Sequence, residues 1–454
     1  MAEKRWAALF ISLVLMWAIV LGSTIYPIVS GDQALVDPTF NVSFMTIPLL
    51  IFNIAYVVIL IFIFIVYLAV FDKIKADQRA SIVAYKASRQ LRNEDLCTII
   101  IPARNEESVI KRTIMTCLEQ THKNLEVVVV CHNCTDGTVE QSRSIDDNRV
   151  KVLELNTEES GKGIALNYGV ENSRGEYILI LDSDGLLSID FIENALALFT
   201  ERDYAAVQGR YIPSNRNFNF VTRMMGLEGD LWSTPYMSVR HFFGRRTPLG
   251  GTGYIIRRQA LKQVGMFANH LVDDYELTFR LLRSKFRIAF APLCINYDEK
   301  PPTIALMLRQ RARWARGFIN LMNTRIAEPT DFIGNIYWIN PVAAFSGLAM
   351  LLIPALAAVY NLLFGYFPFT YAFIPLGAWF ALSGVIAVLQ AAVLLKQYGR
   401  KGLTYIVQIP VLVPFSHYWF ASFAKAFTVK SWANTKTAHG FVEKHERPVA
   451  ADAT

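Results

Sequence analysis

The chain has 454 residues, of which 53% are hydrophobic and only 18% are charged. This length allows two or three domains, and the hydrophobic share is too high for an ordinary soluble enzyme. The net charge of +7 fits a protein that faces the cytoplasm beside anionic lipids. We expect no nucleic-acid partner, because no stretch interleaves basic and aromatic residues as nucleic-acid-binding modules do.

Two apolar, uncharged stretches near the N-terminus, residues 6–29 and 44–71, predict membrane-spanning helices within residues 1–72. Each could cross a hydrocarbon core of roughly 30 Å as a helix, and the first is too long for a cleaved signal peptide. Lys4 and Arg5 precede the first stretch and Lys73 follows the second, whereas residues 30–43 contain neither Lys nor Arg. We therefore expect an integral protein of the plasma membrane whose long middle part is cytoplasmic.

In the middle of the chain, residues 73–300, short β-rich runs alternate with helical patterns, which predicts an open α/β sheet. The predicted strands are 97–102, 125–130, 150–155, 177–182 and 205–209, and the predicted helices are 106–120, 135–145, 162–170 and 189–199. The polar motifs ARNEE, HNCTDGT and DSDG each follow a strand directly. Because such sheets bind ligands at the carboxyl ends of their strands, we expect one cleft to collect these motifs.

Two carboxylates, Asp182 and Asp184, end the predicted strand 177–182. Like charges this close repel unless a proton or cation lies between them. On an extended segment both can lean toward one hard cation with oxygen ligands, and that cation would also neutralise a diphosphate. The alternative is a strand-to-helix turn with Asp as an N-cap, which suits one of the two aspartates but not both.

A second acidic pair, Asp273 and Asp274, precedes leucines at helical spacing in the segment 271–286. Asp274 could act as a general base that takes a proton from an attacking hydroxyl. Carboxylates in the first turn of a helix also interact favourably with its dipole, and that role alone could explain the pair.

The segment 303–318 predicts an amphipathic interface helix within residues 301–330. Gln310, Arg313, Trp314 and Gly317 fall on one stripe of that helix. An amide, a guanidinium and an indole could clamp a phosphate and stack on a sugar ring. Anchoring to lipid headgroups would explain the same helix equally well.

The C-terminal part, residues 331–430, contains two further apolar stretches, 336–366 and 371–395, that predict membrane spans. A third stretch, 403–427, is interrupted by Pro410 and Pro414 and has basic residues on both flanks. We expect a broken or re-entrant segment there and a cytoplasmic tail over residues 431–454.

The five cysteines all fall in the predicted cytoplasmic part, where thiols stay reduced. Cys131 and Cys134 have the spacing of a redox or zinc site, but no second pair completes a tetrahedral site, which favours ordinary loop cysteines.

Taken in order, DSDG, VDDYE and QRARW resemble the D-x-D, [TE]-[ED]-D and Q-x-x-R-W series of membrane-embedded family 2 glycosyltransferases. This family includes cellulose, hyaluronan, chitin and poly-N-acetylglucosamine synthases. The resemblance covers roughly residues 96–317, with support from IPARNEE, ESGKGIALNYG, AAVQGR, PLGGTGYIIRR and SWANTKT. It implies a GT-A-type α/β domain with a mixed, mostly parallel sheet, inserted between transmembrane helices and carrying amphipathic interface helices.

The resemblance also implies residue roles. Asp274, with Asp273 beside it, would form the catalytic set, and Asp182 and Asp184 would bind Mg or Mn. The implied nucleotide-sugar-binding residues are Ala103, Glu106, Asp136, Lys162, Asp182 and Arg313. The implied acceptor-binding residues are Gly251, Thr252, Gly253, Gln310 and Trp314.

One departure from the family pattern concerns the nucleobase. Family members usually carry Asp in the loop after the second strand, where this chain has Cys131 and His132. Uridine recognition would then depend on Asp136 or Asn133, and His132 is expected to contact the nucleobase or pack in the loop. A milder departure is Asp273 in place of the usual Glu, which keeps the charge.

The implied reaction is inverting and metal-dependent, with a UDP-sugar as the first donor to consider and a β-linked product. Our first interpretation is a processive polysaccharide synthase that also secretes its polymer. Its partners would be the growing polysaccharide, membrane lipids and accessory secretion subunits. The alternatives are a transferase that adds one sugar to a membrane lipid and a non-enzymatic transport or scaffold protein with an inactive domain.

Overall fold

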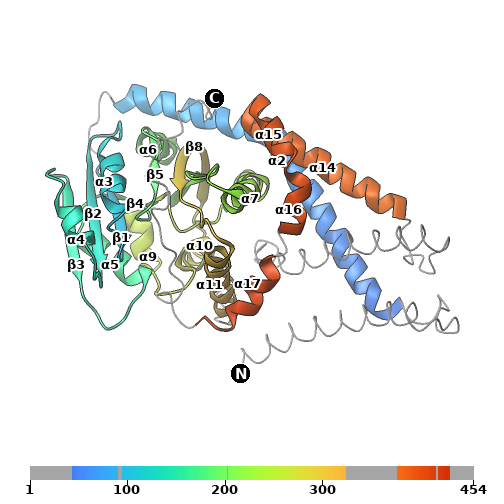
Figure 1. The fold of residues 1–454 in the computed structure, drawn as a ribbon. Helices are drawn as coiled ribbons and strands as arrows, with labels where there is room; N and C mark the ends of the chain where they lie inside the picture. Colours follow the sequence, from blue (N-terminus) through green and yellow to red (C-terminus); the bar gives the residue numbers. More distant parts are fainter. Residues whose placement is uncertain (1–42, 90–94, 202, 324–375, 416–417, 430–454) are drawn as a thin grey trace.

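The computed structural model describes residues 43–89, 95–201, 203–323, 376–415 and 418–429 (Figure 1). Its centre is a mixed sheet of eight strands in these residues, in the order β3-β2-β1-β4-β7-β6-β8-β5. The strands are β1 Cys97–Ala103, β2 Leu125–His132, β3 Val150–Leu155, β4 Tyr177–Ile180, β5 Leu186–Leu187, β6 Ala206–Pro213, β7 Tyr254–Arg257 and β8 Ile288–Asp298.

The predicted α/β fold class is confirmed, with a sheet that is mostly parallel. The pairs β2–β3, β1–β2, β1–β4 and β6–β8 are parallel, while β4–β7, β6–β7 and β5–β8 are antiparallel. All five predicted strands are present, and β5, β7 and β8 were not predicted. The strands β5, β7 and β8 each make an antiparallel pairing, so none of them fits the alternation of strand and helix on which the prediction was based.

Helices cover both faces of the sheet, because its central strands are buried on both sides and need two apolar layers. One face packs on α3 and α6, through residues such as Ile114 and Phe191, and the other packs on α5, α9 and α10, through residues such as Leu166 and Leu277. The helices of this region are α3 Ile110–Leu118, α4 Thr138–Arg143, α5 Lys162–Glu171, α6 Phe191–Glu201, α9 Arg258–Gln263 and α10 Asp273–Arg283.

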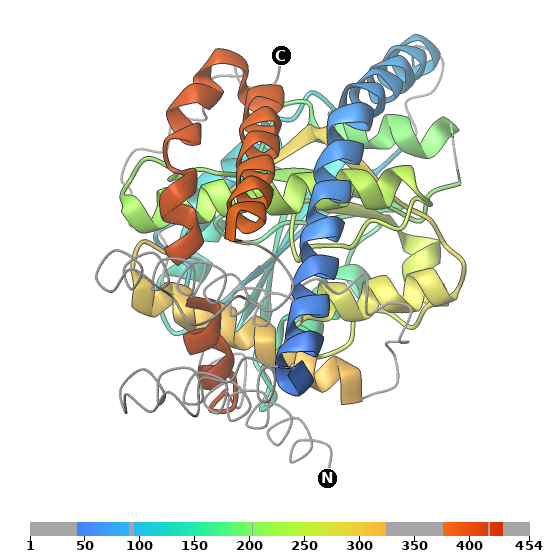
Figure 2. The same ribbon diagram turned by 90° about the vertical axis from the view of Figure 1, so that its right-hand side faces the viewer.

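A nearly continuous helical segment lies beside the sheet and consists of α7 Phe220–Glu228, the π-helix η2 Gly229–Ser233 and α8 Thr234–Phe242. It begins at Asn219, whose side chain accepts a hydrogen bond from the backbone N–H of Thr222, and the Thr222 hydroxyl accepts one from the Asn219 N–H. This reciprocal capping box fixes the start of α7. Figure 2 shows this segment behind the long helix α2 Ser43–Arg89 and the C-terminal helix α14 Leu376–Tyr398.

The α2, α7, η2, α8 and α14 helices share one apolar cluster. Phe64 and Tyr67 of α2 pack with Leu231 of η2, Met237 of α8 and Val393 of α14. The sheet domain and the two apolar helices are therefore joined by a buried interface and not by a linker alone.

Within the described residues, α2 is the one helix that is long and apolar enough to cross a membrane. The predicted span 44–71 falls within it, but the helix continues to Arg89, because residues 72–89 contain neither Gly nor Pro. The extension lies over α6 (Figure 1). The predicted spans 6–29 and 336–366 and the predicted tail 431–454 lie outside the described residues, as does part of the span 371–395.

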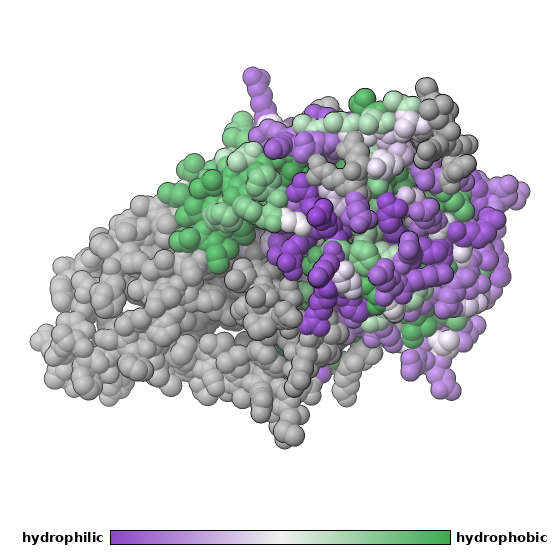
Figure 3. Space-filling view, turned by 180° about the vertical axis from the view of Figure 1, so that it is seen from behind, coloured by the Kyte–Doolittle hydropathy of each residue, from purple (hydrophilic) through white to green (hydrophobic). Residues whose placement is uncertain are grey.

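The predicted broken segment 403–427 is divided into α15 Leu403–Ile406, α16 Ile409–Phe415 and α17 Tyr418–Ala426, after the 3-10 turn η3 Gly399–Gly402. Pro410 is the second residue of α16, in the first turn, where proline costs no hydrogen bond. Whether the segment enters a membrane stays a prediction. Figure 3 shows hydrophobic side chains gathered at the end of the molecule where α2 and α14 lie; exposed ones there are Val58, Phe62, Ile65, Val385 and Val388.

The predicted interface helix is α11 Ile304–Asn323, which is five residues longer at its C-terminal end than the segment that the sequence predicts. Its buried side contacts α10 through Phe318 and α17 through Ala315 and Ile319. These contacts fix α11 between α10 and α17.

Candidate active site

A cavity of about 270 Å³ lies at the carboxyl ends of β1, β2 and β4. Parallel strands bring the residues that follow them to one edge of the sheet, so motifs distant in the sequence converge there. The cavity collects the predicted residues Ala103, Glu106, Lys162, Asp182, Asp184, Gly251, Thr252, Asp273, Asp274, Gln310, Arg313 and Trp314. Asp136 and Gly253 are not in its wall.

Asp136 is used in capping. One carboxylate oxygen accepts a hydrogen bond from the Thr138 N–H at 3.0 Å, and the other accepts one from the Glu107 N–H at 3.3 Å. The two bonds hold the start of α4 against the loop after β1. Its oxygens thus serve backbone donors at a helix N-terminus, and its predicted contact with the nucleotide stays a prediction.

Gly253 lies beneath the cavity wall. Its backbone has φ +60, and a Cβ there would come within 2.6 Å of the Asn296 Cβ. Its N–H donates to the Ile180 carbonyl at 2.8 Å. Gly253 thus sets the turn that presents Gly251 and Thr252, which do line the cavity.

The loop after β2 carries His132 into the cavity wall. Its Nε2 lies 2.8 Å from the Thr157 hydroxyl, and burial lowers the pKa of its imidazole. Asn133 is occupied by the Thr157 backbone, donating to its carbonyl and accepting from its N–H at 2.9 Å each. Cys134 is not disulfide-bonded, and its thiol donates to the Ala103 carbonyl at 3.5 Å.

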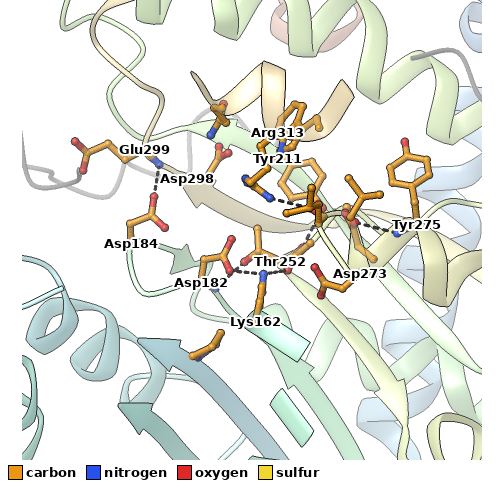
Figure 4. A pocket seen from close by; sticks show the side chains of 18 of the residues that line it. Lys162, Asp182, Asp184, Tyr211, Thr252, Asp273, Tyr275, Asp298, Glu299 and Arg313 are labelled. Atoms are coloured by element: carbon orange, nitrogen blue, oxygen red, sulfur yellow. Dashed lines mark hydrogen bonds and ion pairs between the residues drawn. The ribbon is translucent and has the colours of Figure 1, made fainter. Parts of the chain in front are cut away.

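Asp182 and Asp184 both face the cavity, with different partners (Figure 4). Lys162 donates to the Asp182 carboxylate at 2.6 Å and to the Gly251 carbonyl at 2.6 Å. Asp184 accepts from the Glu299 N–H at 3.3 Å. Burial alone would lower the pKa of Lys162, but the carboxylates of Asp182 and Asp273 outweigh it and raise that pKa. Lys162 is therefore a fixed positive charge among several carboxylates.

Asp298, which the sequence did not suggest, adds a further carboxylate to this corner. Its Oδ1 is buried without a hydrogen-bond partner, and its pKa is raised first by burial and then by the charges of Asp184 and Asp182, against the lowering effect of Lys300. Asp298 is the last residue of β8, and a carboxylate at the end of a strand could have been recognised as a candidate site residue. The strand β8 itself was not predicted, so this indication was missing.

The residues of this corner fit a divalent cation. Their carboxylates are hard oxygen ligands, and their mutual repulsion would be relieved by a positive charge. No group of three or more potential ligands is assembled in the part of the chain that the structure describes. Since Mg is usually bound by one or two carboxylates together with phosphate oxygens and water, Asp182 and Asp184 would be enough protein ligands for such a site.

The acidic pair at the start of α10 lies opposite this corner. Burial first and then the charge of the neighbouring Asp273 raise the pKa of Asp274 to about 7, against the lowering effects of the Tyr275 N–H, Lys162 and Arg313. Burial also raises the pKa of Asp273, whose Oδ2 is buried without a hydrogen-bond partner. A carboxylate with a pKa near neutral suits proton transfer better than an ordinary aspartate does.

The α11 stripe closes the cavity from the other side. Gln310, Arg313 and Trp314 all line it, and Arg313 donates to the Leu271 carbonyl at 3.0 Å. Arg311, which the predicted stripe left out, also lines it. The helix therefore presents two guanidinium groups to the cavity region.

The wall of the cavity beside α7, η2 and α8 carries three large apolar side chains, Met225, Trp232 and Met237, next to the polar Glu228 and Ser233. Tyr275 and Phe318 also line the cavity. Sequence reasoning missed this wall, because single apolar residues on helices cannot be distinguished from core residues without the packing of those helices.

Comparison with known proteins gives a consistent result. Residues 95–317 match the family described as "Glycosyltransferase like family 2". The beta-monoglucosyldiacylglycerol synthase of Nostoc sp. is 32% identical over 234 residues, which cover 48% of this chain and 48% of that protein. The poly-beta-1,6-N-acetyl-D-glucosamine synthase of Staphylococcus aureus is 24% identical over 229 residues, 48% of this chain and 54% of that protein.

The chain spans about half the length of the curated relatives it matches. Among solved structures, the mannosyltransferase PcManGT from Pyrobaculum calidifontis in complex with GDP-Man and Mn2+ has a TM-score of 0.46 and 21% identity. That similarity covers 71% of this chain and 97% of that chain.

Proposed function

We propose that this chain, whose residues 95–317 form a glycosyltransferase family 2 domain, transfers a sugar from a nucleotide-sugar to an acceptor hydroxyl with inversion at the anomeric carbon. The observation that carries the proposal is the half-buried Asp274, with a pKa of about 7, in the same cavity as Asp182, Asp184 and Lys162. A base and a diphosphate-binding corner are what such a reaction needs.

In the proposed reaction, Asp274 accepts the proton of the acceptor hydroxyl as its oxygen attacks the anomeric carbon. The new bond joins the acceptor oxygen to that carbon, and the bond from the carbon to the diphosphate breaks on the opposite face. An α-linked donor therefore gives a β-linked product. Lys162 and Arg313, which line the cavity, are placed to bind the negative charges of the departing diphosphate.

Asp182 and Asp184 would hold Mg or Mn, which when bound neutralises charge on the diphosphate. His132 and Glu106 lie in the cavity wall on the side of the first two strands, where the nucleoside would bind. Because Asp136 and Asn133 are occupied by backbone partners, we do not assign the nucleobase to uracil from this loop.

We propose a membrane lipid as the acceptor. The apolar side chains of Met225, Trp232 and Met237 in the cavity wall support this choice, since they offer contact surface to an acyl chain. The same helices pack on α2, the helix that could cross a membrane, so a lipid could reach this wall from the bilayer. The lipid glycosyltransferase named above is also the more similar of the two curated relatives. The chain would then be an integral membrane protein with its catalytic domain on the cytoplasmic side.

A second candidate is processive synthesis of a polysaccharide. The Gln310, Arg313 and Trp314 stripe in the cavity wall favours it, as does the similarity to the poly-beta-1,6-N-acetyl-D-glucosamine synthase. An inactive transport or scaffold protein would have no reason to keep a base, a diphosphate corner and an aromatic acceptor wall in one cavity.

The test uses the full chain purified in lipid nanodiscs with Mn, a panel of nucleotide-sugars and diacylglycerol as the lipid acceptor. We expect nucleoside diphosphate release with one donor and a product heavier than the lipid by one sugar, with a β-linkage by NMR. A ladder of products, each one sugar heavier, would replace the lipid transferase by the polymerase. No release with any donor would exclude both enzymes.

A further inference from the structure

Arg311, on α11, lines the cavity and lies where α7, α11 and α17 meet. Its guanidinium donates to the Glu228 carboxylate at 3.0 Å and lies 4.2 Å from the ring centre of Trp314. It also lies 5.5 Å from the ring centre of Trp419 on α17. Only 8% of its side chain is exposed, so these contacts replace water and fix its orientation.

Glu228, the last residue of α7, connects this arginine to α17. One of its carboxylate oxygens accepts from Arg311, and the other accepts from the Tyr418 hydroxyl at 2.6 Å and from the Trp419 indole N–H at 3.3 Å. A single carboxylate thus ties the ends of α7, α11 and α17 together. Breaking a buried network of this kind leaves charged groups without partners.

Trp314 is the member of the network that belongs to the proposed acceptor site. Its ring stacks against the guanidinium of Arg311 while it lines the cavity, together with Arg311 and Glu228. An aromatic side chain held on one side by a fixed cation has fewer orientations available on the other. The direction in which Trp314 faces the acceptor therefore depends on Arg311 and Glu228, and through them on Tyr418 and Trp419, which do not line the cavity.

We propose that Glu228, Tyr418 and Trp419 are positioning residues that set the orientation of Trp314 through Arg311, so that α17 is a required part of the acceptor site. This rests on the proposed function for the identity of the acceptor. None of the sequence motifs includes α17, and it follows Trp314 by a long stretch of chain.

The same α11–α17 contact supplies a control. Phe423 packs against Ala315 and Ile319 in a separate apolar cluster, outside the carboxylate network. Phe423→Leu should weaken the packing of α17 without changing the partners of Arg311. An effect that comes only from loosening α17 would appear in this variant too.

The kinetic test compares Glu228→Gln, Tyr418→Phe and Phe423→Leu in the full chain. Loss of an ordered cation–aromatic contact corresponds to about a tenfold change in binding. We therefore expect Glu228→Gln to raise the acceptor KM about tenfold, Tyr418→Phe to raise it less, and both to leave the donor KM unchanged. An unchanged acceptor KM, or an equal rise in Phe423→Leu, would overturn the proposal. Tyr418→Phe removes only the hydroxyl that donates to Glu228. Should Glu228→Gln fail to fold, the acceptor KM of Tyr418→Phe still tests the proposal.

A spectroscopic test needs no turnover. The contribution of Trp314 to the near-UV circular dichroism is the difference between the spectra of a protein with Trp314 and of the same protein with Trp314→Phe. We expect this difference to be much smaller in the Glu228→Gln background than in the wild type, and to persist in the Phe423→Leu background. A full difference signal in Glu228→Gln would contradict the positioning role, whereas absence of any transfer by the wild type would contradict only the proposed function.

Discussion

The two ends of the cavity are built in different ways. At the proposed donor end, Asp182 and Asp184 follow β4 and Lys162 begins α5, and all three carry charge. At the proposed acceptor end, Met225, Trp232 and Met237 come from one helical segment beside the sheet and are apolar. The difference teaches that the edge of a parallel sheet concentrates charged groups from short motifs, while an apolar binding wall arises only when helices pack. Each variant below affects one end and should leave the other unchanged.

The largest effect is expected at the base between the two ends. Asp274→Asn removes the proton acceptor, so kcat should fall by roughly 10² to 10⁴-fold. Binding of the nucleoside diphosphate with Mn, measured by calorimetry, should stay close to that of the wild type. Retained turnover would remove Asp274 from the mechanism.

The next effect concerns the donor end. Asp184→Asn removes a hard oxygen ligand, so activity at a fixed Mn concentration should fall on the order of 10²-fold, with a higher Mn concentration needed for half-maximal rate. The matched control is Asp147→Asn, whose carboxylate pairs with Arg149 outside the cavity wall. A normal Mn titration of Asp184→Asn would mean that the metal is bound elsewhere.

A smaller effect is expected at the acceptor end. Trp232→Ala removes an apolar contact surface, which should raise the acceptor KM by about tenfold, since about 1.4 kcal/mol corresponds to that factor. The donor KM should not change, and kinetics with each substrate varied separately would show it. The lipid-acceptor proposal would fail if Trp232→Ala changed the donor KM instead.

The smallest effect is a shift in pH dependence. With a pKa of about 7, Asp274 loses its basic form as the pH falls through that value, so kcat/KM should decline on the acid side there. Asp273→Asn removes a neighbouring negative charge that raises this pKa, so the decline should move to lower pH. Profiles of kcat/KM against pH check it, and a shift to higher pH would contradict the electrostatic account.

Much of the donor end could be predicted from the sequence. The apolar runs of β1, β2 and β4 are buried strands, and the polar residues after them lie together because parallel strands end at one edge. Lys162 and Asp182 are thus in contact, although the sequence separates them by twenty positions. Asp136 caps α4 in the structure, and its role at the nucleotide stays a prediction, because a carboxylate after a strand can cap the next helix as readily as bind a ligand.

The acceptor end could be predicted only in part. The α11 stripe was visible from helical spacing, but Glu228, Trp232 and Tyr418 belong to no motif, and their roles depend on how α7, η2 and α17 meet. Asp298 was missed since it ends β8, whose run contains Pro292 and does not alternate. Contacts between distant helices are set by packing, which local sequence patterns do not encode.

The most direct test of the division between the two ends is a pair of binding measurements on three proteins. Nucleoside diphosphate with Mn and the lipid acceptor are titrated separately into nanodisc-bound wild type, Asp184→Asn and Trp232→Ala. The account predicts that Asp184→Asn weakens only nucleotide binding and that Trp232→Ala weakens only lipid binding. If either variant weakens both ligands equally, or if each affects the opposite ligand, the proposed arrangement of donor and acceptor in this cavity is wrong.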